Sequence, residues 1–348
     1  MLNILLLADG RSFHTERFLA EIKKRGHQIT LASLEIGQLE QVTFERKGSI
    51  AQLHYFRAIP QLIELIKKLQ PDLISAHFAS GYGFIAARAN RSFNLPLMTN
   101  LWGSDILIVP HKSFLHRWKT KYALKNSDFI VGDSHYLIGE ANKIYPFKNK
   151  AVIPWGIEER YLALHKSDYN YSTPLKVIVP RPHETVYNNQ FIIKALKPLL
   201  SENKIEITFP NFGSLVDDFK KSCVDLPNIN FYNKLNRDEF LKFMASHDIY
   251  LSASRSDSSP VSLIEAMALG LLPVAANIKG VREWLDEKSG FPYGENDYAE
   301  LLQIISSLVD EPKDYAEMRQ QNLARVKSEA IFEKNIDYQL ELIEKMVR

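Results

Sequence analysis

Short apolar runs alternate with amphipathic stretches along the first half of the chain. The apolar runs have the length of β-strands buried on both faces, and the stretches between them place apolar residues at helical spacing. We expect strands at residues 3–9, 28–34, 72–78, 97–102, 129–134 and 151–155, and helices at 15–25, 61–69, 83–91, 114–125 and 137–145. Helical crossovers between buried strands predict a doubly wound α/β domain with a parallel sheet.

A polar, turn-forming segment at residues 162–174 separates this pattern from a second copy of it. We expect further strands at 175–180, 205–209, 229–232, 249–253 and 273–276, and helices at 190–200, 216–224, 237–246, 262–269, 298–309 and 333–346. The sequence therefore predicts two Rossmann-like domains, residues 1–165 and 172–320. A helical segment, residues 321–348, follows and could pack back on the first domain. Two such domains place a ligand crevice at the carboxyl ends of their strands.

The composition excludes several other classes of protein. Of the 348 residues, 45% are hydrophobic and 24% charged, which excludes a disordered or fibrous chain. Cys223 is the only cysteine, so an internal disulfide is excluded, and no Cys/His cluster has zinc-site spacing. No run approaches roughly eighteen apolar residues, and the first apolar run is too short for a signal peptide. We therefore expect a cytoplasmic protein that does not span a membrane.

The net charge differs between the two halves of the chain. Residues 1–165 carry 21 Lys and Arg against 14 Asp and Glu, whereas residues 166–348 carry 22 against 27, giving net charges of +7 and −5. We expect the first half to face something anionic, either a phosphorylated acceptor or a membrane surface. No nucleic-acid-binding motif accompanies the positive charge, so we expect no nucleic-acid partner.

Most common ligand-binding motifs are weak or absent. Gly81-x-Gly83-x-x-Ala86 matches the glycine pattern of dinucleotide-binding domains, but it follows a later strand than that pattern requires. A tight turn with close helix packing is therefore the preferred interpretation. The chain has no Walker loop, Gly-x-Ser-x-Gly elbow or His-Glu-x-x-His motif. It also lacks Asp-x-Asp, the carboxylate pair that carries a divalent ion on a nucleotide diphosphate, so we expect no metal site.

The segment from Ser252 to Glu283 holds the most informative pattern. A predicted strand ends at Ser252, a polar loop carries Asp257, and a helix is expected to begin near residues 261–262 with Glu265 in its first turn. Backbone N–H groups at a helix N-terminus bind phosphate, and a nearby carboxylate can accept hydrogen bonds from two hydroxyls. Alternatively, Glu265 only favours the helix N-terminus and Asp257 is a solvated loop acid.

Asp257-x7-Glu265, followed by Ala-Met-Ala-x-Gly-x-x-Pro-Val-Ala, resembles the signature of glycosyltransferase family 4. The resemblance implies a retaining enzyme of the two-domain GT-B fold. It also implies that Glu265 binds the ribose hydroxyls of a nucleotide sugar and that Asp257 contacts the transferred sugar. Backbone amides would cradle phosphate and hexose at Ser259, Pro260, Val261, Ser262 and Leu263. Family members carry Glu in place of Asp257, and Asp is one methylene shorter.

The same resemblance implies further donor contacts in the second half. Arg181 stands where family members carry an Arg followed by Lys-Gly, and it would neutralise the donor diphosphate. Tyr187 and Asn188 occupy the place of the lysine, so phosphate stabilisation would rest more on Arg181. Glu184 would contact donor hydroxyls or pair with Arg181. Leu235 lies where relatives hold the base through backbone groups. Alternatively, Arg181 is an ordinary surface cation.

Acceptor contacts fall in the first half by the same resemblance. Gly10 and His14 resemble the opening loop of the family, and His77 and Asp105 belong to later signatures of the first domain. The alternatives are that His14 is a turn residue, His77 a buried or capping histidine, and Asp105 an Asx-type cap on a turn. Trp102 stands where many relatives have His, so no histidine role is transferred to it.

Together these features predict transfer of a sugar from a nucleotide diphosphate sugar, UDP- or GDP-linked, to a hydroxyl acceptor, with retention at the anomeric carbon. No cofactor is needed besides the nucleotide sugar, and we expect a role in making cell-surface polysaccharide or glycoconjugates. Two alternatives remain. A GT-B-type epimerase would act on a nucleotide sugar without an acceptor, and a non-catalytic two-lobed protein would bind the donor without turning it over.

Residues 111–127 combine basic and aromatic side chains without an acid. Lys112, Arg117, Lys119, Lys121 and Lys125 are basic, and Phe114, Leu115, Trp118 and Tyr122 recur near helical spacing. A helix of this kind can lie on an anionic membrane, which would serve a lipid-linked acceptor. Alternatively, the aromatic residues form a buried stripe and the lysines a solvated face.

Overall fold

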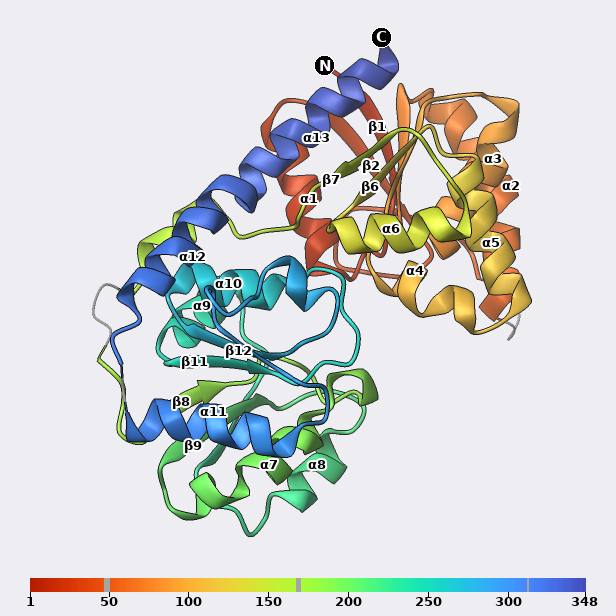
Figure 1. Ribbon diagram of the computed structural model, residues 1–348. Helices are drawn as coiled ribbons and strands as arrows, with labels where there is room; N and C mark the ends of the chain where they lie inside the picture. Colours follow the sequence, from red (N-terminus) through yellow and green to blue (C-terminus); the bar gives the residue numbers. More distant parts are fainter. Residues whose placement is uncertain (47–50, 167–169, 312) are drawn as a thin grey trace. The chain divides into compact units, whose positions relative to one another are not determined.

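The computed structural model describes residues 1–46, 51–166, 170–311 and 313–348. They form two compact units. The first unit contains Met1–Pro154 and Glu333–Arg348, and the second contains Trp155–Phe332. Each unit is built on a parallel sheet with helices on its faces (Figure 1), which confirms the predicted α/β class.

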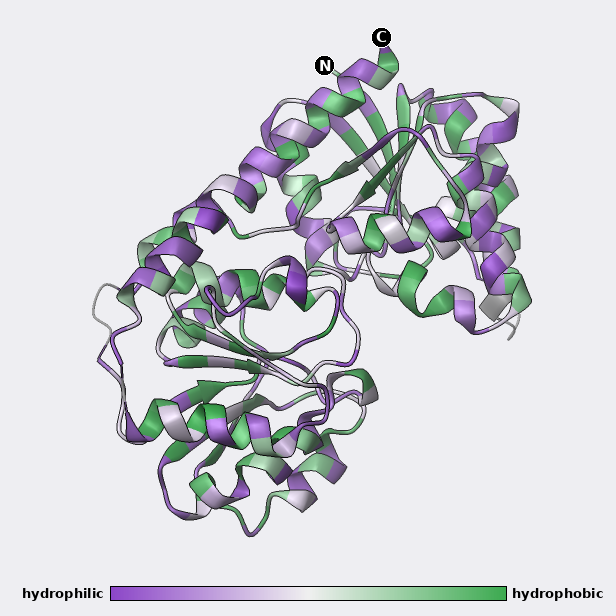
Figure 2. Cartoon of the chain, viewed as in Figure 1, coloured by the Kyte–Doolittle hydropathy of each residue, from purple (hydrophilic) through white to green (hydrophobic). Residues whose placement is uncertain are grey.

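The sheet of the first unit has the strand order β3-β2-β1-β4-β5-β6-β7 in the described residues, and all its paired strands run parallel. Its strands are β1 (Asn3–Leu7), β2 (Gln28–Ser33), β3 (Val42–Thr43), β4 (Leu73–His77), β5 (Leu97–Asn100), β6 (Phe129–Gly132) and β7 (Lys150–Val152). Figure 2 shows its inner strands mainly in the colours of hydrophobic residues, as expected for strands buried on both faces.

Helices cover both faces of this sheet. They are α1 (Phe13–Lys24), α2 (Ala51–Leu69), α3 (Phe84–Ala89), α4 (Ser104–Leu107), α5 (Phe114–Lys125), α6 (His135–Ile144) and α13 (Phe332–Val347), with short turns η1 (Phe78–Gly83), η2 (Asn90–Ser92) and η3 (Val109–His111). Leu5 and Leu7 of β1 pack in one cluster with Leu62 of α2 and Ile85 of α3. Figure 1 shows α1 and α13 on the opposite side of the sheet from α2 and α3.

The sheet of the second unit has the order β10-β9-β8-β11-β12-β13 in the described residues, again with parallel pairing. Its strands are β8 (Leu175–Ile178), β9 (Ile205–Pro210), β10 (Ile229–Tyr232), β11 (Ile249–Ser252), β12 (Leu272–Ala276) and β13 (Phe291–Tyr293). Its helices and turns are α7 (Asn189–Ser201), α8 (Val216–Ser222), α9 (Arg237–Ala245), α10 (Val261–Leu269), α11 (Tyr298–Asp310), α12 (Ala316–Glu329), η4 (Glu159–Leu164), η5 (Thr185–Tyr187) and η6 (Val281–Glu283).

Alternate residues of the central strands face two separate cores in the second unit. Val177 packs in one core with α7, α8 and α11, whereas Ile178 packs in the other with α9, α10 and α12. Leu251 and Tyr250 divide in the same way. This alternation follows from the period of two along a strand, and it places α10 with its flanking loop directly on the sheet.

The chain passes between the units at two places, after Pro154 and after Phe332. Within the second unit the two passing segments are paired. The amide of Ile157 donates to the Ala330 carbonyl, and the amide of Phe332 donates to the Ile157 carbonyl, both at 2.9 Å. The ring of Trp155 stacks on that of Phe332, with centroids 6.5 Å apart.

The unit boundaries therefore differ from those expected at residues 165 and 321. The first unit ends earlier because η4 packs against α9 and α10 in the second. The second extends further because α12 packs against α10. The terminal helix α13 carries the chain back to the first unit, where Ile336, Leu340 and Ile343 are buried. Residues 167–169 of the expected linker lie outside the described residues.

The Gly81-x-Gly83-x-x-Ala86 motif lies in η1 and the start of α3. A Cβ atom on Gly83 would lie 3.3 Å from the Thr99 side chain and 3.4 Å from that of Ala123. The motif therefore accommodates close packing of a helix against β5 and α5.

Candidate functional site

Arg181 and Asp257 lie on the loops that follow β8 and β11, at the carboxyl edge of the second sheet. The Nη2 group of Arg181 donates a hydrogen bond to Oδ2 of Asp257 at 2.7 Å, and both side chains are largely buried. The Arg181 guanidinium also lies 5.3 Å from the ring centroid of Tyr187. Burial lowers the pKa of Arg181, but Tyr250 and Asp257 outweigh it and raise that pKa above its ordinary value. A permanent positive charge is thus fixed at this edge.

The loop that carries Asp257 is packed from two sides. A Cβ atom on Gly280 would lie 2.1 Å from the Asp257 carbonyl oxygen, so only glycine permits this close approach. The indole Nε1 of Trp284 donates to Oγ of Ser259 at 2.8 Å. The loop is therefore held in place before α10 begins.

The first residues of α10 are those that we expect to bind the donor phosphate. Pro260 is the N-cap residue, and Val261, Ser262 and Leu263 make the first turn. Oγ of Ser262 lies 3.2 Å from the hydroxyl of Tyr250, which anchors this turn to β11. The first amides of a helix lack intrahelical acceptors and carry the positive end of the helix dipole. The turn can therefore bind an anion beside Arg181.

Glu265 was expected in the first turn of α10 and instead begins the second turn. Because the helix begins at Val261, Glu265 is its fifth residue, and only 3% of its surface is exposed. Oε1 of Glu265 pairs with Nη1 of Arg237, and Nη2 of Arg237 donates to Oε2 of Glu158 at 2.8 Å. Burial lowers the pKa of Arg237, but Glu265 and Glu158 outweigh it and raise that pKa. The expected ribose ligand is thus a buried, ion-paired carboxylate.

Glu184 and Leu235 lie on two separate loops of the second unit, after β8 and after β10. Glu184 accepts hydrogen bonds from the Ser214 hydroxyl and from the Ser214 amide, the latter at 2.7 Å, and these bonds lower its pKa. It therefore pairs with Ser214 rather than with Arg181. Leu235 lies between β10 and α9, two residues before Arg237.

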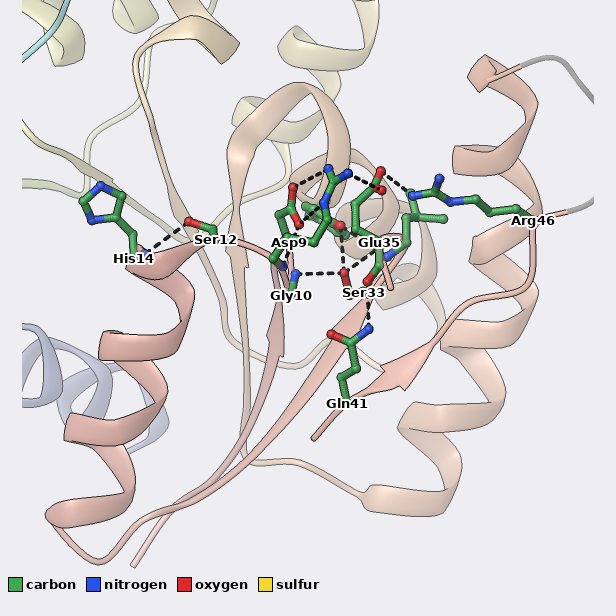
Figure 3. A network of polar contacts seen from close by, with 11 residues as sticks. Asp9, Gly10, Ser12, His14, Ser33, Glu35, Gln41 and Arg46 are labelled. Carbon is green, nitrogen blue, oxygen red and sulfur yellow. Dashed lines mark hydrogen bonds and ion pairs between the residues drawn. The ribbon is translucent and has the colours of Figure 1, made fainter. Parts of the chain in front are cut away.

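Gly10 belongs to a network of polar contacts at the carboxyl ends of β1 and β2 (Figure 3). The Arg11 guanidinium donates to the two carboxylate oxygens of Asp9 at 3.1 and 2.9 Å. It also lies 3.1 Å from Glu35, which pairs in addition with Arg46. Two arginines therefore lie beside the loop where we expect the acceptor.

His14 and His77 both lie next to the Trp102 ring. Their ring centroids are 5.8 and 5.7 Å from that of Trp102, and the ring of Phe18 lies 4.9 Å from that of His77. The amide of His14 donates to Oγ of Ser12, the N-cap residue of α1, at 3.2 Å. Burial, followed by the charge that His14 can carry, lowers the pKa of His77 to about 3. His77 is therefore a neutral, buried imidazole.

Asp105 is completely buried, and its carboxylate accepts hydrogen bonds from backbone amides. Its Oδ2 accepts from the Ala79 amide at 2.7 Å, and its Oδ1 accepts from the Trp102 amide at 2.9 Å. Burial raises the pKa of Asp105 to about 6, although the backbone hydrogen bonds oppose this shift. The carboxylate thus ties η1 to the loop that carries Trp102.

Family models match both halves of the chain. The "Glycosyl transferase 4-like" model matches residues 3–134, and the "Glycosyl transferases group 1" model matches residues 172–325. The chain belongs to glycosyltransferase family 4. It is a nucleotide-sugar-dependent glycosyltransferase of the GT-B fold, as the Asp257-x7-Glu265 segment indicated.

Relatives and solved structures resemble this glycosyltransferase over most of its length. An uncharacterized glycosyltransferase of Methanocaldococcus jannaschii is 25% identical over 86% of this chain and 85% of its own. The putative teichuronic acid biosynthesis glycosyltransferase TuaC of Bacillus subtilis is 25% identical over 68% of this chain and 65% of its own. The crystal structure of Anabaena HepE in complex with UDP-glucose has a TM-score of 0.81 at 17% identity, covering 99% of this chain and 100% of that one.

Sequence reasoning missed Arg237 and the Arg11–Glu35–Arg46 contacts. No motif marks Arg237, which follows the N-cap Asn236 of a helix with an ordinary capping box. The one available signal was physical: a carboxylate in an apolar helix such as α10 requires a cation when buried. Glu35 and Arg46 lie in loops around the short strand β3, where no periodicity identified them.

The helix α5 lies within residues 111–127 and exposes most of its aromatic face. Phe114 is 85% exposed, and Leu115 and Trp118 are also exposed, so these three do not form a buried stripe. Lys119 differs from its expected place on this surface. It is buried, its Nζ lies 4.3 Å from the ring centroid of Tyr55, and burial lowers its pKa to about 8.

Among the described residues, no helix combines the length and apolarity needed to cross a bilayer.

Proposed function

We propose that this glycosyltransferase transfers a sugar from a UDP- or GDP-linked donor to a hydroxyl acceptor, with retention at the anomeric carbon and without a metal ion. The observation that carries the proposal is the contact between Arg181 and Asp257 beside the first turn of α10. Arg181 and the α10 amides neutralise the diphosphate, Asp257 contacts the sugar, and Glu265 binds the ribose. HepE, which has the same fold, was crystallised with UDP-glucose, so UDP-sugars are the first donors to test.

The reaction breaks the bond between the anomeric carbon and the β-phosphate oxygen and forms a bond between that carbon and the acceptor oxygen. The acceptor proton passes to the departing diphosphate, so no protein nucleophile is required. The developing anion is stabilised by Arg181 and the helix amides, which are oriented before the reaction begins. Glu184 keeps the neighbouring loop in place through Ser214.

The acceptor binds at the carboxyl edge of the first sheet, where Gly10 and His14 contact it. His77 and Asp105 support that surface from beneath, because both are buried. Arg11 and Arg46 lie in the same region and favour an acceptor that carries phosphate. We assign the enzyme to synthesis of cell-surface polysaccharide or glycoconjugates in the cytoplasm, with residues 111–127 in contact with an anionic membrane that carries a lipid-linked acceptor.

Incubation with UDP-glucose, UDP-N-acetylglucosamine and GDP-mannose, with and without lipid-linked and soluble glycan acceptors, tests the proposal. We expect release of nucleoside diphosphate and a glycosylated product that keeps the anomeric configuration of the donor. Donor consumption without an acceptor would favour the epimerase. Donor binding without turnover in any mixture would favour the non-catalytic protein.

A further inference from the structure

Arg237 joins the two parts of the second unit that we expect to hold the nucleoside. It is the first residue of α9 and follows the base-binding loop at Leu235 by two positions. Its guanidinium contacts Glu265 of α10, the expected ribose ligand. One side chain therefore connects the base loop to the ribose carboxylate.

The contacts of Arg237 form a buried three-residue chain. Nη1 pairs with Oε1 of Glu265, and Nη2 donates to Oε2 of Glu158 at 2.8 Å. The exposed fractions of the Arg237, Glu158 and Glu265 side chains are 14%, 13% and 5%. Burying a carboxylate as deeply as Glu265 costs free energy unless a cation or several hydrogen-bond donors pair with it. The planar guanidinium supplies that charge and also fixes the orientation of the carboxylate.

We propose that Arg237 is a positioning residue for the donor nucleoside. By binding Oε1 it directs the second oxygen of Glu265, Oε2, toward the two ribose hydroxyls, and it sets the distance between that carboxylate and the base loop. Glu158 binds the other guanidinium nitrogen. Without Glu158, both nitrogens of Arg237 could bind Glu265 and occupy both of its carboxylate oxygens. The inference rests on the proposed function, in which Glu265 binds ribose.

The test compares UDP with 2′,3′-dideoxy-UDP, which lacks the ribose hydroxyls, by calorimetry on the full chain. Arg237→Gln is expected to weaken UDP binding at least tenfold, the scale of one charge-assisted hydrogen bond, and to change dideoxy-UDP binding less than threefold. In a Glu265→Gln background, Arg237→Gln should cause no further loss of UDP affinity, because the two residues act on one contact. Arg237→Lys should restore part of the affinity.

Lys221→Gln is the matched control. Lys221 is an exposed residue of the same unit, paired with Asp218 on α8, and its loss should leave both affinities unchanged. If Arg237→Gln does not fold, Glu158→Gln provides the test. It frees the guanidinium to bind both oxygens of Glu265 and should weaken UDP binding about fivefold while sparing dideoxy-UDP.

Equal losses for the two nucleotides would overturn the proposal, because a merely structural residue would not distinguish them. Unchanged UDP affinity in Arg237→Gln, or a gain, would also overturn it, since a gain means that Arg237 competes with the ribose. A wild-type protein that binds none of UDP, GDP and ADP would overturn the proposed function and this inference with it. UDP binding that is insensitive to Arg237 would overturn the inference alone.

Discussion

The guanidinium of Arg181 donates a hydrogen bond to the carboxylate of Asp257 at 2.7 Å. The residue that would neutralise the donor diphosphate and the residue that would contact the transferred sugar are therefore one ion pair. Asp257 is a methylene shorter than the Glu of other family members, yet it reaches Arg181 from the loop before α10. Because the two side chains share a contact, we expect their substitutions to have non-additive effects on catalysis.

Arg181→Lys is expected to weaken UDP binding about tenfold. Lysine keeps the charge but lacks the planar fork that can bind Asp257 and a phosphate at the same time. Calorimetry measures the affinity, and uridine, which has no diphosphate, provides the control. An equal loss of affinity for uridine would show a general disruption of the site and contradict the diphosphate role.

Glu265→Gln is expected to lower donor affinity at least tenfold, since the side chain keeps its shape but loses the charge that strengthens hydrogen bonds to the ribose. A charge-assisted hydrogen bond contributes roughly 1.5–3 kcal/mol. Glu287→Gln, at an exposed position of the same unit, is the control and should bind the donor normally. Normal donor affinity in a folded Glu265→Gln protein would refute the ribose assignment.

Most strands and helices were predictable because the spacing and length of their apolar runs mark them in the sequence. Phe114–Lys125 and Ile229–Tyr232 were placed at their observed bounds. The pattern missed β3 and β13, which have only two and three residues, too few to show a period. It placed only part of α12 within the expected helical segment 321–348 and missed the start of this helix, whose buried face contains Arg319 and Asn322 beside Val326 and so lacks an apolar stripe.

The candidate site was predictable only where a motif marked it. Asp257 and Glu265 were found through their spacing, but the partners of Glu265 were not, because Arg237 and Glu158 are distant in sequence and contact it only after folding. Lys119 was expected on the basic surface because sequence spacing does not distinguish the buried side of a mostly polar helix. Tertiary contacts, rather than local pattern, decide these positions.

Glycosyl transfer is expected to persist in excess chelator. In the proposed mechanism Arg181 and the amides of α10 would supply the positive charge that a divalent ion otherwise brings to the diphosphate, and the chain has no Asp-x-Asp pair. The rate of nucleoside diphosphate release, with and without EDTA, measures this. Loss of activity in EDTA that is restored by titrating manganese or magnesium would contradict the prediction.

His77 is expected to make the stability of the chain depend on pH. Its folded pKa is about 3, whereas an unfolded histidine titrates near 6.5, so only the unfolded state gains a proton as the pH falls below about 6.5. Above that pH, His77 leaves the free energy of unfolding unchanged, and below it that free energy decreases as the pH falls. At pH 5.5 the decrease is about 1.4 kcal/mol.

His77→Gln removes this proton uptake, so its unfolding free energy should fall about 1.4 kcal/mol less than that of the wild type between pH 8 and pH 5.5. Denaturant unfolding at both pH values measures the difference. The raised pKa of Asp105, about 6, acts in the opposite direction, but it is present in both proteins and cancels. Identical pH dependence in the two proteins would show that His77 is not the responsible group.

The exposed face of α5 is expected to bind anionic membranes. Phe114, Leu115 and Trp118 are exposed there beside Lys121 and Lys125. The ring of Trp118 contacts the buried ring of Phe84, which also contacts the exposed Phe56 of α2. Aromatic side chains can therefore insert at a bilayer surface while the lysines bind anionic headgroups.

Co-sedimentation with vesicles of phosphatidylglycerol and of phosphatidylcholine at low salt measures this binding. Each lysine near the surface contributes about 1 kcal/mol, so replacing both Lys121 and Lys125 by Glu should weaken binding to phosphatidylglycerol at least tenfold. Replacing Lys143 and Lys148 by Glu changes the net charge equally at exposed lysines outside α5 and should have little effect. Phe114→Ser should weaken binding without altering its salt dependence, because it removes apolar contact alone.

Equal binding to the two lipids, or equal losses in the two lysine pairs, would exclude α5 as the membrane contact and favour a soluble acceptor.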